Sequence, residues 1–285
     1  MAAFKPLVYV IVLNWNGWRD TLKCLLSLET LDYPNYRVVV VDNGSTDDSA
    51  DRIKKAHPDV ELIGTSKNLG FAGGNNVGIR YALERGADYV WLLNNDTKVD
   101  SHALTAMVEV AERDLEIGAV GSVLYYMDEP ERVQAWGGGW VSLWWGISRH
   151  FAAPVPAERV HYITGASLLI RRKVLEEVGL LDEGFFMYWE DTDFGFRLRK
   201  AGWKLAVASD ARVWHKESAS LGRQSPVLDK YFNASAVRFF RRHAPFPMMP
   251  ILVGPGGRFL KRVVRREWGQ AGAVLRGIAQ HEYSE

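Results

Sequence analysis

The sequence has little cysteine, almost no net charge and no long apolar run, and each of these shortages excludes a class of protein. Cys24 is the only cysteine among 285 residues, which excludes an intramolecular disulfide and a cysteine-based zinc site. The 35 basic and 34 acidic residues leave a formal charge of +1, so we predict no nucleic acid partner. The longest apolar stretches, residues 7–13 and 246–253, are far shorter than the ~20 residues of a membrane-spanning helix.

The composition that remains is typical of a globular protein, with 47% hydrophobic and 24% charged residues. Lys5 precedes the apolar run 7–13, as in a secretory signal, but the run continues into Asn14 without a small-residue cleavage site. We therefore interpret residues 7–13 as a buried strand and expect a cytoplasmic enzyme.

The first 125 residues alternate between predicted strands and predicted helices. Apolar or β-branched runs predict five strands, at residues 7–13, 37–41, 60–63, 89–93 and 119–125. Helical spacing of apolar residues predicts four helices between them, at about 22–31, 49–57, 75–85 and 101–114. This alternation predicts an α/β fold with a mostly parallel sheet flanked by helices. Ligands of such sheets bind at the carboxyl ends of the strands, here just after residues 13, 41 and 93.

The alternation stops near residue 127. Residues 128–160 predict a hairpin or an irregular lid. Four tryptophans in this segment either stack on sugar rings or a lipid-linked acceptor, or pack as a small core: Trp136, Trp140, Trp144 and Trp145. Later segments predict strands at 160–170 and 204–215 and helices at 172–178, 190–201 and 228–243. A proline-rich break and one basic helix complete the chain.

Three polar segments lie where the sheet predicts a ligand. Asp42 opens the segment D-N-G-S-T-D, which either binds a ribose or a base imide or forms a simple turn. Residues 68–75 are rich in glycine and precede a helix, so they either hold a phosphate or allow tight packing. Neither segment is a G-x-G-x-x-G motif, which disfavours a nicotinamide dinucleotide site. Asp96 closes the segment N-N-D, where its carboxylate could hold a divalent metal against a diphosphate.

Three carboxylates gather at the start of the predicted helix 190–201: Glu190, Asp191 and Asp193. Helix capping explains one of them well and three poorly. Arg197 is spaced to pair with Asp193 along the helix. His215 ends the last predicted strand, as either a metal ligand or a structural histidine, and Cys24 is predicted to be a buried, inert thiol.

Taken in order, these segments resemble glycosyltransferase family 2. The resemblance rests on V-L-N-W-N-G, V-V-D-N-G-S-T-D, N-L-G-F-A-G-G-N-N, L-L-N-N-D, T-G-A-S, L-D-E-x-F-F-x-Y-x-E-D-x-D-F and W-H, from residue 8 to residue 215. The helix at 231–243 is also similar to that family. The N-W-N and N-N-D variants are most similar to its bacterial rhamnosyltransferase-like branch. The resemblance implies a GT-A fold and sugar transfer with inversion at the anomeric carbon.

The resemblance also implies how the chain is divided. Residues 1–125 would form the half of the GT-A domain that binds the nucleotide-sugar. Residues 126–222 would form a mixed acceptor and catalytic half of the same domain. Residues 223–285 would form a helical, basic C-terminal segment.

Roles for individual residues follow from the same resemblance. Asp42 would contact a pyrimidine base, helped by Leu13 and Asn14. Asp96 matches the last Asp of a D-x-D metal motif, and His215 matches a histidine that completes the metal shell in some members. The remaining residues implied in binding the nucleotide-sugar are Asn16, Asn68, Gly70, Gly74, Asn75, Asn94, Asn95, Thr164, Gly165 and Ala166. Asn94 replaces the first Asp of the D-x-D motif, which should weaken the affinity for Mg²⁺ or Mn²⁺.

The catalytic assignment rests on Asp191, which matches the general base of the family. An inverting transfer needs such a base on the acceptor hydroxyl, opposite the leaving group. Asp193 is placed for a structural pair with Arg197. Glu190 adjoins Trp189 and is assigned to orient the acceptor or the start of the helix.

We therefore predict an inverting glycosyltransferase with dTDP-rhamnose favoured over a UDP-hexose as donor and a glycan or lipid-linked acceptor. The alternatives are a nucleotidyltransferase and an inactive nucleotide-sugar binder. Residues 14–18 lack the basic, glycine-rich loop of the first, and the presence of Asp96 and Asp191 disfavours the second. A basic helix at 258–278 with an adjacent apolar face either lies on the inner face of the plasma membrane or packs on the domain.

Overall fold

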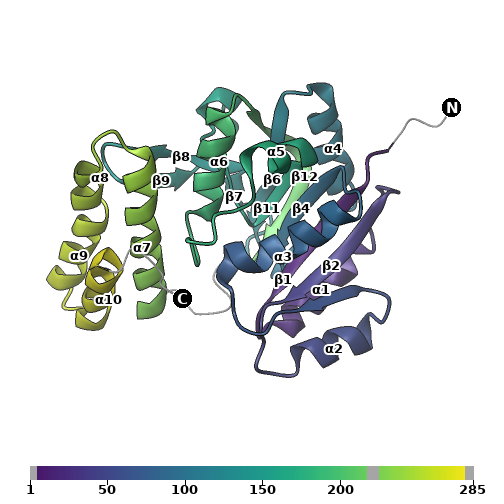
Figure 1. The fold of residues 1–285 in the computed structure, drawn as a ribbon, viewed down its shortest axis with the longest axis horizontal. Helices are drawn as coiled ribbons and strands as arrows, with labels where there is room; N and C mark the ends of the chain where they lie inside the picture. Colours follow the sequence, from purple (N-terminus) through teal and green to yellow (C-terminus); the bar gives the residue numbers. More distant parts are fainter. Residues whose placement is uncertain (1–4, 217–224, 280–285) are drawn as a thin grey trace.

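The computed structural model describes residues 5–216 and 225–279, which form a central sheet flanked by helices and a group of C-terminal helices (Figure 1). Among these residues the central sheet contains β1 (Val8–Asn14), β2 (Tyr36–Asp42), β3 (Glu61–Gly64), β4 (Tyr89–Asn94), β5 (Thr97–Val99), β6 (Ile117–Tyr126), β7 (Val133–Trp136), β11 (Ser167–Arg171) and β12 (Lys204–His215). A second, antiparallel sheet contains β8 (Gly138–Ser142), β9 (Ile147–His150) and β10 (Tyr162–Ile163).

The strand order confirms the predicted α/β class. The central sheet runs β3-β2-β1-β4-β11-β6-β12-β5, and β7 pairs with β6. β1 is parallel to β2 and β4, and β6 is parallel to β12, whereas β11 runs antiparallel between β4 and β6. The register sets Asn14 opposite Asp42 and Leu13 opposite Asn94. The polar ends of these strands therefore lie at one edge of the sheet.

Two apolar cores, one on each face, hold the helices against the sheet. α1 (Trp18–Leu28) and α4 (Ala103–Arg113) cover one face, and α3 (Gly70–Glu84), α5 (Arg172–Val178) and α6 (Glu190–Lys200) cover the other. α2 (Ser49–Ala56) packs beside α1. Val10 and Val12 face the first core and Ile11 the second, because successive residues of a strand point to opposite faces. Cys24 lies fully buried in the first core, as predicted, and burial raises the pKa of its thiol to about 12.

α3 begins five residues earlier than the sequence predicted. Gly70 starts the helix with a φ of +74°, and Asn68 Oδ1 accepts a hydrogen bond of 2.8 Å from its backbone N–H. A Cβ at Gly74 would lie 2.5 Å from the side chain of Leu13, and a Cβ at Gly78 would lie 2.5 Å from Ile11. These two glycines therefore allow α3 to approach β1, which confirms the tight-packing interpretation for this part of the segment.

The middle of the chain differs from the prediction in its details. β8 and β9 form the predicted hairpin, and a short 3₁₀ helix follows it at Ala157–Arg159. The strand predicted at 160–170 is divided into β10 and β11 by the turn at residues 164–166. β5 was not predicted, because three residues are too short for a periodic pattern to be recognised.

The C-terminal helices gather at one end of the molecule, on the far side of α6 from β1 and β2 (Figure 1). They are α7 (Pro226–His243), α8 (Met248–Val253), α9 (Pro255–Val264) and α10 (Trp268–Ala279). The prediction of a single basic helix at 258–278 is wrong. The chain turns at Arg266, where φ is +59°, and the segment is divided between α9 and α10. The proline-rich break contains α8. No helix among the described residues is long and apolar enough to cross a bilayer.

Candidate active site

A pocket of about 570 Å³ extends from the carboxyl ends of β1 and β4 to the C-terminal helices. Its wall contains most of the predicted site residues: Leu13, Asn68, Gly70, Asn94, Asn95, Asp96, Thr164, Gly165, Ala166, Glu190, Asp191 and His215. These residues come from separate parts of the chain, and the sheet and α6 bring them together. The location agrees with the rule that ligands of open α/β sheets bind at the carboxyl ends of the strands.

Asp42 lies beside this pocket rather than in its wall, with 7% of its surface exposed. Asn14 Nδ2 donates a hydrogen bond of 2.7 Å to Asp42 Oδ1, and the Ser45 hydroxyl donates another of 2.5 Å to the same oxygen. Asn14 is itself buried, and its Oδ1 accepts a bond of 2.8 Å from Thr21 Oγ1. This network fixes the Asp42 carboxylate at the end of β2.

Three other predicted nucleotide residues also lie outside the wall of the pocket. Asn16 is exposed, and its Oδ1 accepts a hydrogen bond of 2.8 Å from the backbone N–H of Thr46. Asn75 is buried within α3 and donates a bond of 2.9 Å to the carbonyl of Phe71. Gly74 packs against Leu13, as described above. All three therefore have structural contacts that explain the residue found there.

Asp96 and His215 face each other in the wall of the pocket. His215 Nε2 lies 3.2 Å from Asp96 Oδ1 and 3.2 Å from the side-chain nitrogen of Asn94. His215 Nδ1 lies 2.8 Å from Gln134 Oε1 and donates to that oxygen when it carries the proton. Burial would raise the pKa of Asp96, but the hydrogen bond and charge of His215 outweigh burial and hold the pKa below its usual value.

These side chains have the chemistry that a divalent cation needs. A carboxylate and an imidazole nitrogen are both metal ligands. When His215 is neutral and its Nδ1–H donates to Gln134, the Nε2 lone pair faces Asp96 in place of the proton that the charged ring donates to it. Two acceptor atoms facing each other are stabilised by a cation between them. Within the described part of the chain, no third His, Cys, Asp or Glu joins this pair. Other ligands would therefore be amide, water or substrate oxygens.

The turn before α6 has an unusual backbone conformation. Tyr188 and Trp189 have φ values of +68° and +69°, although neither is glycine. Trp189 is 5% exposed and packs against the rings of Phe239 and Phe240 in α7. This packing compensates for a strained turn, and strain of this kind is commonest at functional sites. The turn delivers the first two residues of α6 to the pocket.

Those two residues, Glu190 and Asp191, form a pair of carboxylates with different surroundings. Asp191 Oδ2 accepts a hydrogen bond of 2.8 Å from Gly165 N, and Oδ1 accepts bonds of 2.6 and 3.0 Å from the backbone and hydroxyl of Thr192. Burial raises the pKa of Asp191, and these hydrogen bonds oppose the rise. Burial and the neighbouring Asp191 raise the pKa of Glu190 well above its usual value. Hydrogen bonds from Gly165 and Thr192 thus favour the ionised form of Asp191, whereas Glu190 Oε2 has no hydrogen-bond partner among the described residues.

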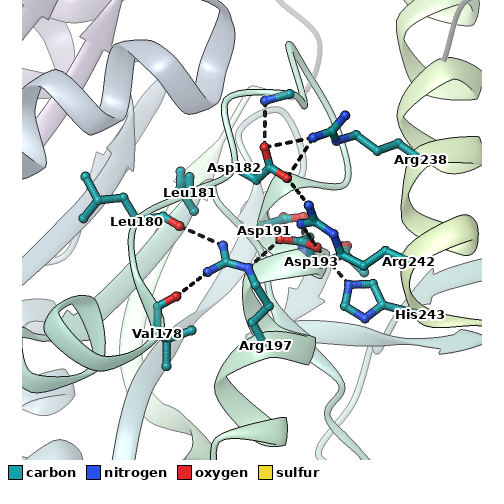
Figure 2. Close-up of polar contacts among 12 residues, drawn as sticks. Val178, Leu180, Leu181, Asp182, Asp191, Asp193, Arg197, Arg238, Arg242 and His243 are labelled. Atoms are coloured by element: carbon teal, nitrogen blue, oxygen red, sulfur yellow. Dashed lines mark hydrogen bonds and ion pairs between the residues drawn. The ribbon is translucent and has the colours of Figure 1, made fainter. Parts of the chain in front are cut away.

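Asp193 has a different role, as the centre of a buried ionic network (Figure 2). Its Oδ2 accepts a hydrogen bond of 2.7 Å from Arg197 Nε, which confirms the predicted pair. Its Oδ1 accepts bonds of 2.9 Å from Arg242 Nη1 and 2.8 Å from His243 Nε2. Burial would raise the pKa of Asp193, but His243, Arg197 and Arg242 together lower it to about 2.

The same network joins α6 to α7 and to the segment between α5 and α6 (Figure 2). Arg197 donates hydrogen bonds of 2.9 and 2.8 Å to the carbonyls of Val178 and Leu180. Asp182 pairs with Arg238 at 3.1 Å and with Arg242 at 2.6 Å. The helix that carries Asp191 is therefore fixed to its neighbours from two sides.

Several residues in the wall of the pocket were not predicted: Trp15, Asn43, Arg149, Tyr162, Phe232 and Arg258. Asn43 belongs to the segment that begins at Asp42 and could have been found there. Its side chain accepts from Leu69 N at 3.0 Å and donates to the Gly70 carbonyl at 3.0 Å, which anchors the start of α3. Phe232 and Arg258 reach the pocket from α7 and α9, and no motif marks them.

Comparison with known proteins identifies a family and relatives that this chain resembles in sequence. Residues 9–179 match the family model of glycosyl transferase family 2. The N-acetylglucosaminyl-diphospho-decaprenol L-rhamnosyltransferase of Mycobacterium tuberculosis is 31% identical over 266 residues, which cover 85% of this chain and 87% of that protein. The dTDP-rhamnosyl transferase RfbF of Shigella flexneri is 23% identical over 73% of this chain and 68% of its own length.

The fold is also found among solved structures. The mannosyltransferase PcManGT from Pyrobaculum calidifontis, in complex with GDP-Man and Mn²⁺, has a TM-score of 0.64 and an identity of 18%. The match covers 98% of this chain and 88% of that one. The predicted GT-A fold is therefore confirmed.

Proposed function

Because the chain belongs to glycosyl transferase family 2, we propose that it moves a sugar from a nucleotide-diphospho-sugar to an acceptor hydroxyl with inversion at the anomeric carbon. The observation that carries this proposal is the presence, in one pocket, of Asp191 and of the Asp96–His215 pair. Such a reaction needs a base on the acceptor and positive charge on the departing diphosphate. The two groups are suited to these two tasks.

Asp191 would act as the general base. As the acceptor oxygen forms its bond to the anomeric carbon, Asp191 takes the hydroxyl proton, and the bond from that carbon to the diphosphate oxygen breaks on the opposite face. The hydrogen bonds from Gly165 and Thr192 hold the carboxylate in a fixed orientation. Glu190, whose raised pKa favours the protonated form, would donate a hydrogen bond that orients the acceptor.

Asp96 and His215 would hold Mg²⁺ or Mn²⁺, with the donor diphosphate and water as further ligands. The metal, when bound, supplies Lewis-acid stabilisation of the negative charge on the leaving diphosphate. Asn94 is uncharged where the family has an aspartate, so the affinity for the metal would be lower than in members with that aspartate. The amide oxygen of Asn94 remains a chemically acceptable ligand.

The donor would be a pyrimidine nucleotide-sugar, with dTDP-rhamnose favoured over a UDP-hexose. Asn14 and Ser45 both bond to Asp42 Oδ1, which leaves Oδ2 available to accept the imide N–H of the base. The preference for rhamnose is supported by the two relatives named above, whose names specify rhamnosyl transfer. The base preference follows from Asp42, and the sugar preference follows from the relatives.

The acceptor would be lipid-linked, and the protein would contact the inner face of the plasma membrane. Exposed apolar side chains on α8–α10 and beside them support this: Phe246, Met248, Leu252, Leu260, Val264 and Trp268. The tip of the β8–β9 hairpin extends the same surface, since the ring of Trp144 lies 5.6 Å from that of Phe246. Exposed apolar patches of this kind are typical of membrane or protein contacts.

The predicted basic face of residues 258–278 is not the part that would make this contact. Arg258 points into the pocket, and Arg262 is bonded to Asp229 and Glu267. Lys261 and Arg265 remain exposed and could approach anionic headgroups. Apolar side chains rather than a basic stripe would therefore dominate the attachment.

A thermal-shift assay with a panel of nucleotides, with and without Mn²⁺, tests the proposed donor. We expect UDP and dTDP to raise the unfolding temperature and GDP to leave it unchanged. A ligand at a hundred times its Kd adds about 2.7 kcal/mol of stability, which is readily measured. An equal or larger shift with GDP would contradict the assignment of Asp42, and an absence of any shift with all three would contradict a nucleotide-sugar site.

A further inference from the structure

Arg258 brings a positive charge into the pocket from the C-terminal helices. It is the fourth residue of α9, and its guanidinium carbon lies 4.0 Å from the ring centroid of Phe232 in α7. Both side chains line the pocket that contains Glu190 and Asp191. Stacking on an aromatic face orients a guanidinium while leaving its N–H groups free to bind an anion.

Arg258 has no carboxylate partner among the residues that the structure describes. The charge of Asp229 acts on Arg258, but the Asp229 carboxylate is paired with Arg262 at 3.0 Å, and Glu267 also pairs with Arg262 at 2.5 Å. Arg258 remains exposed to solvent within the pocket. An arginine that is held in place without an anion, at the wall of a pocket, is well suited to bind a phosphate group of a ligand.

The position of Arg258 relates it to the acceptor rather than to the donor. α6, which carries Asp191, contacts both the sheet and α7, and it lies between them in Figure 1. In an inverting transfer the acceptor approaches the anomeric carbon from the side opposite to the departing diphosphate. Because the donor would lie at the strand ends beside Asp96, a group on α9 lies on the acceptor side of Asp191.

The surface next to Arg258 has the chemistry of a lipid contact. Leu252 in α8 and Leu260 in α9 are 63% and 62% exposed. Arg258 therefore lies between the polar pocket and this apolar surface. An acceptor in which a charged link joins a sugar to a lipid chain would match this order of groups. Its sugar would lie beside Asp191, its charged link beside Arg258, and its lipid chain beside the apolar side chains.

We propose that Arg258 binds the diphosphate that joins sugar and lipid in the acceptor. The inference rests on the proposed function and adds the chemical class of the acceptor link. Arg149 also lines the pocket, from β9, but it has no ring contact among the described residues that would hold it in place. Arg258 is thus the basic residue that selects a diphosphate-linked acceptor over a simple glycoside.

The first test compares two acceptors that differ only in the link. One carries N-acetylglucosamine joined to dodecanol through a diphosphate, and the other is the dodecyl glycoside of the same sugar. We expect Arg258→Gln to raise the KM for the diphosphate acceptor by about tenfold or more, because a charge-assisted hydrogen bond is lost. The KM for the glycoside and the Kd for UDP or dTDP should be unchanged. Arg258→Lys should raise the KM for the diphosphate acceptor less than Arg258→Gln does, because lysine keeps the positive charge.

Arg276→Gln is the matched control, since it makes the same substitution at an exposed position of the neighbouring helix α10. We expect it to leave both KM values unchanged. If Arg258→Gln raised the KM equally for both acceptors, the proposal would be overturned in favour of a structural role for Arg258. A weaker Kd for the nucleotide would overturn it in favour of a contact with the donor.

A second readout does not depend on turnover. Calorimetry would measure the affinity of dodecyl diphosphate for the protein saturated with UDP, so that the donor site is filled. Arg258→Gln should weaken this binding by about tenfold, whereas Arg276→Gln should not. Equal affinities for wild type and Arg258→Gln would overturn the proposal. Inactivity of the wild type with every donor and acceptor would contradict the proposed function instead, and the calorimetry would still decide the role of Arg258.

Discussion

Replacement of Asp193 by asparagine tests whether the ionic network in Figure 2 stabilises the packing of α6, the helix that carries Asp191. Asp193 is fully buried, and its pKa of about 2 lies below the ordinary value of 3.8. This difference corresponds to about 2 kcal/mol of stability at neutral pH. Asparagine also leaves Arg197 and His243 without their anion. We therefore expect Asp193→Asn to lower the free energy of unfolding by about 3 kcal/mol in total. The loss stays at the lower end of the range for buried pairs because Arg242 keeps its bond to Asp182.

The assay is urea unfolding of Asp193→Asn at a series of pH values. Because the pKa is lower in the folded state, the stabilisation is complete above about pH 5 and declines as the pH falls through 3.8 toward 2. We therefore expect the difference between wild type and variant to be largest at neutral pH and to narrow below about pH 5.

Asp48→Asn is a matched control, since Asp48 and Arg52 have the same spacing and the same distance of 2.7 Å as Asp193 and Arg197. The side chain of Asp48 is 49% exposed, so solvent screens this pair, and we expect no resolved change. The reasoning would be refuted if Asp193→Asn lowered the free energy of unfolding by no more than Asp48→Asn does.

Two further predictions concern the metal and the membrane. Asn94→Asp should lower the Mn²⁺ concentration that gives half-maximal activity, because it adds a carboxylate beside Asp96 and His215. An unchanged dependence of activity on Mn²⁺ would show that residue 94 is not a metal ligand. The full chain should float with anionic liposomes at low salt, and replacing Trp144 and Leu252 by serine should reduce the bound fraction, because both side chains are exposed on the proposed contact surface. Failure of the wild type to float would contradict peripheral attachment.

Structural features that depend on residues close together along the chain could be predicted from the sequence. The alternating strands and helices of the first 125 residues follow from local periodicity, and their order places Asn14, Asp42 and Asn94 at one edge. The pairing of Asp193 with Arg197 follows from helical spacing. For this reason the order of the first strands and helices, the gathering of their polar ends at one edge and one ionic contact could be predicted from the sequence.

Contacts between distant segments could not be predicted in the same way. Arg242 and His243 meet Asp193 from 49 and 50 residues further along the chain, and nothing in the local pattern indicates this. The insertion of β11 between β4 and β6 also depends on tertiary pairing. The division of the basic helix depends on a left-handed residue, Arg266, where the usual signals of glycine or proline are absent.

The assignment of Asp191 as general base is the central claim, and Asp191→Asn tests it most directly. The measurement is kcat with a nucleotide-diphospho-sugar donor, together with the Kd for the nucleotide. We predict that kcat falls by about 10²- to 10⁴-fold while the Kd is nearly unchanged, because a general base acts on the transition state. Near-normal turnover by the folded Asp191→Asn protein would contradict the account.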